Sequence, residues 1–368
     1  MAVTVGMDFG ERRRLPNLRL YFFVCNSGRA CYTDFVMKME FFSLIIVALI
    51  SALVIALVLL VVAGVCSLCG AVSFGTVFVK GLWSMLLIPA VMIYGGLVER
   101  NLLTVKNVDV PSEKLPETFD GYRIVHISDL HLRSFRGRSG ALKRAVEKIN
   151  ALEPDLICFS GDLVTMASAE IEPFQDILSS LKARDGVVSV MGNHDYCSYN
   201  PDESLDKDDE AAKVRSAERK MGWHLLDDAN FSIVRGGRSL SVLGVQNISA
   251  SRQFQSYGDL VKAMAGADGE YKILVSHDPT HWRQEVLGRQ DVGLVLSGHT
   301  HAMQLSLFGW CPSRYMFREY RGLYSETTDF GTQYIYVNPG LGETIFPLRI
   351  GVVPEISLIT LRSPVSEH

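Results

Sequence analysis

The sequence predicts an α/β domain that follows a pair of apolar helices. Three observations support this prediction: an uncharged apolar block lies near the N-terminus, short β-branched runs alternate with amphipathic segments after it, and polar motifs follow several of these runs. The 368 residues hold 36 basic and 40 acidic side chains, for a net charge of −4, and 48% are hydrophobic. This composition excludes a disordered chain and a basic nucleic-acid-binding protein, so we expect no nucleic-acid partner.

Two apolar runs lie in the first hundred residues. The first, residues 41–65, carries no charge, and a helix of that length covers the roughly 30 Å hydrocarbon core of a bilayer. The second, residues 81–98, begins after Lys80, which suits the flank of a membrane span better than its centre. We therefore predict a two-helix transmembrane hairpin over residues 41–98. The alternative for each run is a buried helix of a soluble domain.

The charges before the hairpin predict its orientation. The N-terminal tail, residues 1–40, holds six basic side chains, and positively charged flanks stay on the cytoplasmic side. We expect a multi-pass protein of the cell membrane whose domain faces the cytoplasm. Met37, directly before the apolar run, is an alternative start, and a start there would remove five of the six charges.

The remainder of the chain has the pattern of an α/β domain over residues 122–368, joined to the hairpin by a linker, residues 99–121. Helical patterns between strands predict at least a partly parallel sheet. The expected strands are Arg123–Ser128, Asp155–Ser160, Val187–Met191, Ser239–Val245, Lys272–Ser276, Val292–Ser297, Gln333–Val337 and Glu355–Leu361, and the expected helices are Ser139–Leu152, Ile171–Lys182, Asp208–Met221 and Tyr257–Ala267.

Polar motifs follow five of the expected strands and hold five of the nine histidines. Loops at the carboxyl ends of adjacent strands in an open α/β sheet converge on one crevice, so we expect these motifs to form one site. Residues two apart, as in Asp-x-His and His-x-His, share a face of the chain. The motifs are Asp129-Leu130-His131, Gly161-Asp162, Gly192-Asn193-His194-Asp195, His277-Asp278 and Gly298-His299-Thr300-His301.

In this order the five motifs resemble the calcineurin-like metallophosphoesterase superfamily, over residues 122–361. The resemblance implies a four-layer α/β/β/α sandwich, a metal-dependent hydrolase of phosphoric esters or pyrophosphates, and two metal ions. It also implies that His194 donates to a phosphate or leaving-group oxygen, with Asp195 as its orienting partner. The implied ligands are Asp129, His131 and His301 for one metal ion, Asn193, His277 and His299 for the other, and Asp162 between them.

The donor types themselves suit this chemistry. Carboxylate, imidazole and amide ligands favour Mn, Fe or Zn over an ion that prefers thiolates. The positive charge of two divalent ions exceeds the negative charge of two aspartates. The site therefore has a net positive charge, which attracts phosphate. Two ions about 3.5–4 Å apart can also clamp the attacking and leaving oxygens and supply hydroxide near neutral pH.

Two later motifs narrow the resemblance to a membrane-anchored bacterial branch. The last histidine motif runs on to Gln304, and a Tyr-Val-Asn-Pro-Gly-Leu-Gly segment occupies residues 336–342. Thr165 stands where purple acid phosphatases carry a tyrosine, and Met191 stands where serine/threonine phosphatases carry an arginine. These two differences argue against both of those branches. Proteins similar to this branch include UDP-2,3-diacylglucosamine pyrophosphatases of lipid A biosynthesis.

Aromatic side chains and arginines alternate over residues 305–321, which we call the aromatic segment. Placed after a metal-binding motif and behind a membrane hairpin, this segment can enter the bilayer interface and admit an acylated substrate, with its arginines on phosphate groups. We expect Arg314, Arg318 and Trp310 to bind substrate. The alternative is that the aromatic side chains cover the edge of the sheet.

The main functional hypothesis is a membrane-anchored phosphoesterase that cuts a P–O bond by metal-hydroxide attack, with a lipid-linked pyrophosphate such as UDP-2,3-diacylglucosamine as a candidate substrate. Its partners would then be the lipid bilayer and a phosphoester, acylated or not. Two alternatives remain: a non-catalytic metal-binding regulatory or scaffold protein of the membrane, and a general phosphodiesterase acting on soluble or nucleic-acid substrates.

Overall fold

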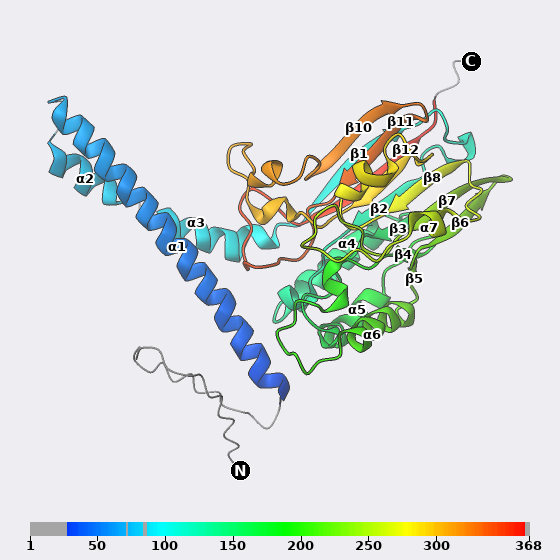
Figure 1. The fold of residues 1–368 in the computed structure, drawn as a ribbon, viewed down its shortest axis with the longest axis horizontal. Helices are drawn as coiled ribbons and strands as arrows, with labels where there is room; N and C mark the ends of the chain where they lie inside the picture. Colours follow the sequence, from blue (N-terminus) through cyan, green and yellow to red (C-terminus); the bar gives the residue numbers. More distant parts are fainter. Residues whose placement is uncertain (1–27, 71–72, 84–86, 365–368) are drawn as a thin grey trace, which may run out of the picture.

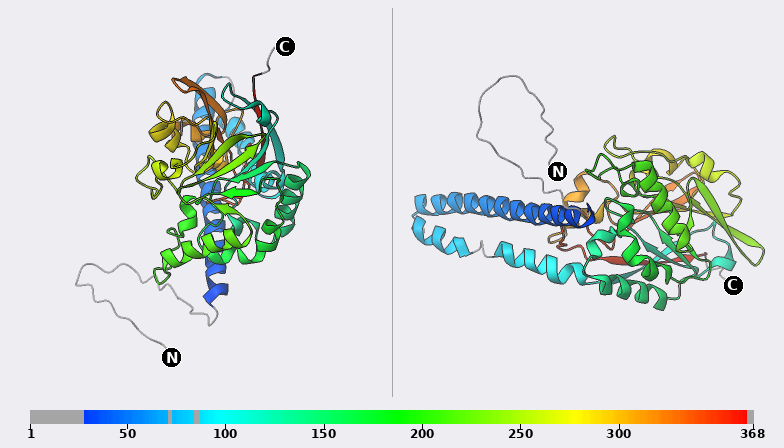
Figure 2. Two further views of the ribbon diagram at one scale, coloured as in Figure 1. Left: turned by 90° about the vertical axis from the view of Figure 1, so that its right-hand side faces the viewer. Right: turned by 90° about the horizontal axis from the view of Figure 1, so that it is seen from below.

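The computed structural model describes residues 28–70, 73–83 and 87–364. Its N-terminal part is helical: α1 (Gly28–Leu68) is followed by α2 (Phe74–Leu82), α3 (Leu87–Ile93), a π turn (Tyr94–Val98) and a 3-10 turn (Glu99–Asn101). Two views show α1 lying beside the α2–α3 stretch, with both leaving the domain on the same side (Figure 1 and Figure 2).

Two helical stretches are long and apolar enough to cross a membrane. They are Ala48–Leu68, with a mean hydropathy of 3.1, and Phe74–Asn101, with a mean hydropathy of 1.8. The rest of the protein buries almost none of either stretch, unlike the core helix of a soluble domain. Both agree with membrane association. Helix α1 begins before the apolar run, at Gly28, and residues 1–27 of the expected tail lie outside the described residues.

The domain is built on two six-stranded sheets within the described residues. The first has the order β1-β12-β2-β3-β4-β5 and the second the order β10-β11-β9-β8-β7-β6. Strands β2 to β5 are mutually parallel, as are β7, β8, β9 and β11. The strands are β1 (Thr104–Pro111), β2 (Arg123–Ile127), β3 (Leu156–Phe159), β4 (Val187–Ser189), β5 (His224–Leu225), β6 (Ala229–Arg235), β7 (Arg238–Gly244), β8 (Tyr271–Val275), β9 (Leu294–Ser297), β10 (Gly322–Thr328), β11 (Gly331–Val337) and β12 (Glu355–Arg362).

The central strands of both sheets are buried on both faces, and their successive side chains alternate between the inter-sheet core and an outer layer. In β3, Leu156 and Cys158 face the space between the sheets, whereas Ile157 and Phe159 face the helices. In β8, Ile273 faces the inter-sheet core. Its neighbour Leu274 packs in the cluster on the outer face. The architecture is therefore the expected four-layer α/β/β/α sandwich.

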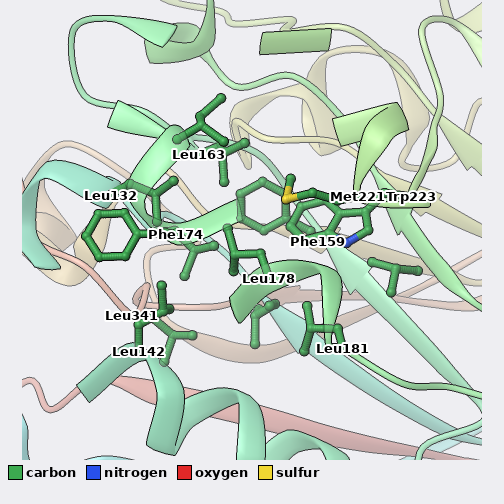
Figure 3. Close-up of a cluster of buried hydrophobic side chains, with 14 of the residues drawn as sticks. Leu132, Leu142, Phe159, Leu163, Phe174, Leu178, Leu181, Met221, Trp223 and Leu341 are labelled. Carbon is green, nitrogen blue, oxygen red and sulfur yellow. The ribbon is translucent and has the colours of Figure 1, made fainter. Parts of the chain in front are cut away.

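The outer helices complete the layers. α4 (Ser139–Ala151), α5 (Gln175–Ser179) and α6 (Lys207–Lys220) cover the first sheet. Figure 3 shows the apolar cluster beneath them, with Phe159 beside Trp223 and Leu142 near Leu341. On the second sheet, α7 (Leu260–Met264) and the π turn Trp282–Val286 form the outer cluster.

All eight expected strands are present, with ends shifted by at most two residues. Two expected helices are shorter than predicted. The stretch 171–182 is interrupted by a 3-10 turn around Pro173, so only α5 is α-helical. Helix α7 starts late because the side chain of Asp259 caps it, accepting a hydrogen bond from the backbone N–H of Lys262.

The expected linker, residues 99–121, contains β1, so the sheet extends N-terminal to residue 122. β1 pairs in parallel with β12, and β12 pairs antiparallel with β2. The start of β1 therefore lies at the edge where β2 to β5 end. The backbone N–H of Arg349 also donates to the Gly95 carbonyl, 3.3 Å away. The helical hairpin thus joins the domain at the edge that carries the polar motifs (Figure 1).

Candidate metal centre

The first donor cluster combines the loops after β2 and β9. The Nε2 atom of His301 lies 3.2 Å from Asp129 Oδ1 and 3.1 Å from the Nε2 atom of His131. All three side chains are buried. Three donors from segments 170 residues apart therefore point at a common position, as the motif order predicts.

The second cluster combines the loops after β4, β8 and β9. The Asn193 Oδ1 atom lies 3.1 Å from His277 Nε2 and 2.9 Å from His299 Nδ1. The Nδ1–H group of His277 donates to the Ser160 carbonyl at 2.7 Å, which leaves its Nε2 atom as a lone-pair donor. An amide oxygen and two imidazoles therefore converge here.

Asp162 connects the two clusters. Its Oδ2 atom lies 3.5 Å from His131 Nε2 and 3.2 Å from His277 Nε2. Its other oxygen accepts a hydrogen bond from the backbone N–H of His194 at 2.9 Å, which fixes the carboxylate. Asp162 therefore has the geometry of a bridging ligand.

The donor set fits two divalent metal ions. The Nε2 atoms of His131 and His301 face each other across 3.1 Å, and their Nδ1 atoms are buried without a hydrogen-bond partner in the described part of the chain. Two imidazole lone pairs at this distance repel each other unless a cation or a shared proton lies between them. Oxygen and nitrogen donors without thiolate suit Mn, Fe or Zn.

Charges in the centre stabilise one another. Burial alone would raise the pKa of Asp162, but His277, His194 and His131 hold it well below its usual range. Burial would conversely lower the pKa of His277, and the Asp162 carboxylate raises it to about 10. The negative charge of Asp162 that favours a proton on His277 also favours a metal cation at this position.

The backbone at the ligands is unusual. Five of the candidate ligand residues adopt a positive φ between 41° and 69°, which non-glycine residues rarely do. Strain of this kind persists where the surrounding structure enforces it, and it is common at functional sites. The loop after β9 also needs Gly298, because a Cβ atom there would lie 1.8 Å from Ser128 Oγ. The five are Asp129, His131, Asp162, His299 and His301.

His194 lies beside the centre and is oriented by a backbone carbonyl. Its Nδ1–H group donates to the Thr165 carbonyl at 2.8 Å, so its Nε2 atom is the remaining ring donor or acceptor. A ring nitrogen of His194 lies within 4.8 Å of donor atoms of His131 and Asp162. The half-buried position suits a residue that meets a substrate oxygen.

Asp195 does not orient His194, contrary to the expectation from the resemblance. Its carboxylate accepts backbone N–H bonds from Asp162 at 2.8 Å, Gly192 at 2.9 Å and Val164 at 3.0 Å. It therefore fastens the loop after β3 to the loop after β4. The motif spacing places Asp195 next to His194 in the chain, but the turn between them directs the two side chains apart.

Sequence reasoning missed several neighbours of the centre. Tyr199 accepts a hydrogen bond from Asn193 Nδ2 at 3.0 Å, and its ring lies 4.5 Å from the ring of His194. Phe254 packs edge-on against His299 at 4.5 Å. Neither residue lies in a polar strand-end motif, so the sequence held no signal for them. Gln304, from the extended histidine motif, instead holds the loop 344–348 through its side-chain amide.

The structure does not bring the expected substrate-binding residues to the metal ligands. Arg318 is paired with Glu326 at 3.3 Å, and Arg314 lies over the ring of Tyr315. Trp310 donates its indole N–H to the hydroxyl of Tyr315. The contact between the aromatic segment and the ligands is made by Phe317, 5.6 Å from the His299 ring.

Several apolar side chains of the aromatic segment are exposed, although Phe317 and Tyr320 are half-buried. Phe308 is fully exposed, and Tyr315 and Met316 are 73% and 64% exposed. Exposed apolar clusters of this kind mark interaction or membrane surfaces. The exposure favours the interpretation that this segment enters the bilayer interface over the interpretation that it covers the sheet edge.

The fold and this donor set define a metallophosphoesterase, and the chain belongs to the calcineurin-like phosphoesterase family. The family model matches residues 122–303. The protein YkuE of Bacillus subtilis, described as an uncharacterized metallophosphoesterase, is 30% identical over 305 residues, which are 78% of this chain and 96% of YkuE.

Two further relatives bear on the membrane and on the substrate. A zebrafish "transmembrane protein with metallophosphoesterase domain" is 32% identical over 287 residues, 75% of this chain and 62% of that protein. The UDP-2,3-diacylglucosamine pyrophosphatase LpxG of Chlamydia trachomatis is 27% identical over 255 residues, 58% of this chain and 74% of LpxG. The chain spans about three fifths of the zebrafish relative and of its cattle counterpart, at 62% and 57%.

Proposed function

We propose that this protein is a membrane-anchored, dinuclear-metal-dependent phosphoesterase that hydrolyses a P–O bond. The observation that carries the proposal is the convergence of Asp162 with the donors of both clusters within 3.5 Å. Four histidines, two aspartates and one asparagine that meet in this way, beside the half-buried His194, match the chemistry of the family.

Each side chain has a role in this proposal. Asp129, His131 and His301 would hold one ion, and Asn193, His277 and His299 the other, with Asp162 shared. The ions would supply Lewis-acid activation of water and of the phosphoryl group. His194, held by the Thr165 carbonyl, would donate a proton or hydrogen bond to a phosphate or leaving-group oxygen.

A lipid-linked pyrophosphate such as UDP-2,3-diacylglucosamine is the substrate that we propose first. The similarity to LpxG supports it, and so does the exposed apolar surface of the aromatic segment at the edge that carries the centre. In this proposal Trp310 contacts acyl chains, and Arg314 and Arg318 contact phosphate head groups at the bilayer interface, away from the metal centre. The experiment below distinguishes this proposal from two alternatives. One is a scaffold protein without activity, and the other is a phosphodiesterase for soluble substrates.

We also propose that both apolar helices cross the membrane and that the domain, residues 99–368, faces the cytoplasm. The basic tail supports this orientation. Reporter fusions after Val98 test it: a reporter active only in the cytoplasm is expected, and one active only outside the cell would reverse the orientation.

The test of the function is hydrolysis by the full chain in detergent with added Mn²⁺. UDP-2,3-diacylglucosamine and a soluble aryl phosphodiester are compared for the wild type, Asp129→Ala and His301→Ala. We expect the wild type to turn over the lipid substrate and both substitutions to abolish this turnover. Turnover of the aryl ester alone would leave the metal chemistry and remove the lipid assignment. No metal-dependent turnover of either would favour the non-catalytic alternative.

A further inference from the structure

A cavity of about 170 Å³ lies between the candidate metal centre and the place where the helical hairpin joins the domain. We call it the arginine pocket, because the guanidinium groups of four arginines line it. The lining also includes one carboxylate and the residue whose carbonyl orients His194. The residues that matter here are Arg100, Arg133, Arg136, Arg138, Glu343 and Thr165.

The charge of the pocket is strongly positive. Four arginines and Glu343 give the lining side chains a formal charge of +3, and Glu170 lies beside Arg133 outside the lining. Arg100 binds Glu343 with an Nη2–Oε2 distance of 2.6 Å, and Arg138 lies 3.4 Å from the same oxygen. The Glu343 side chain is 2% exposed, so this carboxylate faces the protein, where Arg100 and Arg138 pair with it.

Two lining arginines have donors without an acceptor. The Nε atom of Arg138 is buried and has no hydrogen-bond partner among the residues that the structure describes. The exposed side chain of Arg136 makes no hydrogen bond or ion pair within the same residues. The guanidinium group of Arg136 is therefore available to an external anion, because no described residue engages it.

The acids near the pocket do not supply that acceptor. Glu170 is buried beside Arg133, but its oxygens already accept backbone N–H bonds from Thr165 at 2.7 Å and Met166 at 2.9 Å. A phosphate group carries several acceptor oxygens in a compact shape, and arginine binds it with paired N–H groups. The cavity has the volume of roughly five water molecules, which is enough for a phosphate group.

The position of the pocket indicates where the phosphate comes from. Arg100 lies within the last turn of the apolar stretch Phe74–Asn101, so the pocket sits where a membrane span ends. Ile345, in the pocket lining, is 71% exposed. Basic residues at this level meet the phosphate groups of lipid heads.

We propose that the arginine pocket binds the phosphate group of an anionic lipid head next to the metal centre. The inference rests on the membrane anchoring in the proposed function but not on hydrolysis. A lipid held in this position lies beside Thr165, so its head group is close to His194. A phosphate of the substrate and a phosphate of a bilayer lipid share this chemistry.

The test is binding to the full chain in detergent with EDTA, so that the metal centre and its activity play no part. Dihexanoyl phosphatidic acid is titrated beside dihexanoyl phosphatidylcholine, which has the same acyl chains, and beside inorganic phosphate. Thermal stabilisation and calorimetry report affinity. The variants are Arg136→Gln and Arg136→Lys, because this exposed side chain supports no internal contact. Arg144→Gln is the control, since it removes an exposed arginine on α4 that does not line the pocket.

Phosphatidic acid is expected to bind more tightly than phosphatidylcholine. Arg136→Gln should weaken its binding about tenfold, Arg136→Lys less, and Arg144→Gln little. Tighter binding of phosphatidic acid than of inorganic phosphate supports a lipid head as the ligand. Equal binding of the two supports a phosphate site but overturns the lipid assignment. No binding, or equal losses in Arg136→Gln and Arg144→Gln, overturns the pocket as a phosphate site, whatever the enzyme hydrolyses.

Discussion

Asp162 joins the two halves of the candidate metal centre through one oxygen atom. Its Oδ2 faces His131 and His277, and its Oδ1 is held by the backbone of His194. A neighbour that only orients a ligand changes metal affinity or activity by about 10- to 100-fold when it is removed. The loss of a shared ligand should exceed that range.

Asp162→Asn should therefore lower metal content and reduce hydrolysis by more than about a hundredfold. Metal analysis of the purified protein and Mn²⁺-dependent turnover of an aryl phosphodiester measure the two effects. Asp176→Asn, at an exposed position on α5, is the matched control and should change neither. Full metal content together with full activity in Asp162→Asn would contradict the bridging role.

His194→Ala should leave metal content unchanged and lower turnover by about 10²- to 10⁴-fold, the usual contribution of a positioned acid or base. The loss should be larger for an alkyl phosphodiester than for an aryl ester, because the aryl leaving group needs less protonation. Turnover of both esters and metal analysis are measured in parallel. Equal losses on the two esters would contradict proton donation to the leaving group.

Sequence reasoning could identify the donors but not their backbone. Residue types and spacing place His299 and His301 in one loop. The amino-acid sequence does not show that both residues adopt a positive φ. The same limit explains the error on Asp195. Its partners are backbone N–H groups of Asp162, Gly192 and Val164, and only the folded loops bring these together.

At the scale of elements, α6 carries a buried carboxyl group that the site does not use. Glu218 is fully buried and lies 2.5 Å from Ser189 Oγ of β4, and its Oε1 has no hydrogen-bond partner in the described residues. Burial raises the pKa of Glu218 well above its usual value. The folded protein therefore keeps a proton there that the unfolded chain releases.

Between the unfolded and the folded pKa the native state binds more protons, so stability falls as pH rises. Glu218→Gln removes this dependence and keeps the shape of the side chain. Its melting temperature, compared with wild type from pH 5.5 to 8, should show a difference in favour of the variant that grows with pH. The corresponding difference in the free energy of unfolding has a limiting slope of about 1.4 kcal/mol per pH unit. Glu147→Gln, an exposed position on α4, is the control. A difference in melting temperature between wild type and Glu218→Gln that stays constant with pH would contradict a buried, protonated Glu218.

The aromatic segment lies beside the site without forming part of the sheets. Replacing Phe308 and Trp310 together by serine should reduce turnover of a lipid substrate about tenfold or more, because each loses roughly 1.5–3 kcal/mol of apolar contact with the interface. Turnover of a soluble aryl phosphodiester should stay near the wild-type value. Val234→Ser, at an exposed position on β6, should affect neither. Equal losses on both substrates would remove the segment from lipid recognition.

Elements could be predicted where their pattern is local. The buried parallel strands are short apolar runs bounded by polar turns, and all eight were found. The strand β1 lies within the expected linker and has no buried apolar run, since five of its eight residues are exposed and only Val110 is buried. Its strand conformation depends on pairing with β12, about 250 residues later. The arginine pocket was missed for the same reason, since Arg100 and Glu343 are 243 residues apart.

At the scale of the whole molecule, the pairing of β1 with β12 predicts where the domain can be cut. A chain that begins at Glu99 keeps β1 and the Arg100–Glu343 ion pair, and should fold as a cooperative unit. A chain that begins at Tyr122 exposes the edge of β12 and uncovers Val110's neighbours in the inter-sheet core. Thermal unfolding and size-exclusion chromatography compare the two. Equal stability of both chains would show that β1 does not belong to the domain.

The junction between anchor and domain has a kinetic consequence. If the apolar helices cross the membrane as proposed, the Gly95–Arg349 hydrogen bond and the Arg100–Glu343 ion pair would hold the domain against the end of these helices and fix the height of the site above the bilayer. An enzyme held at fixed height samples substrate in two dimensions. Its velocity would then follow the mole fraction of substrate in the membrane, and would fall on surface dilution with inert lipid while the bulk substrate concentration stays constant.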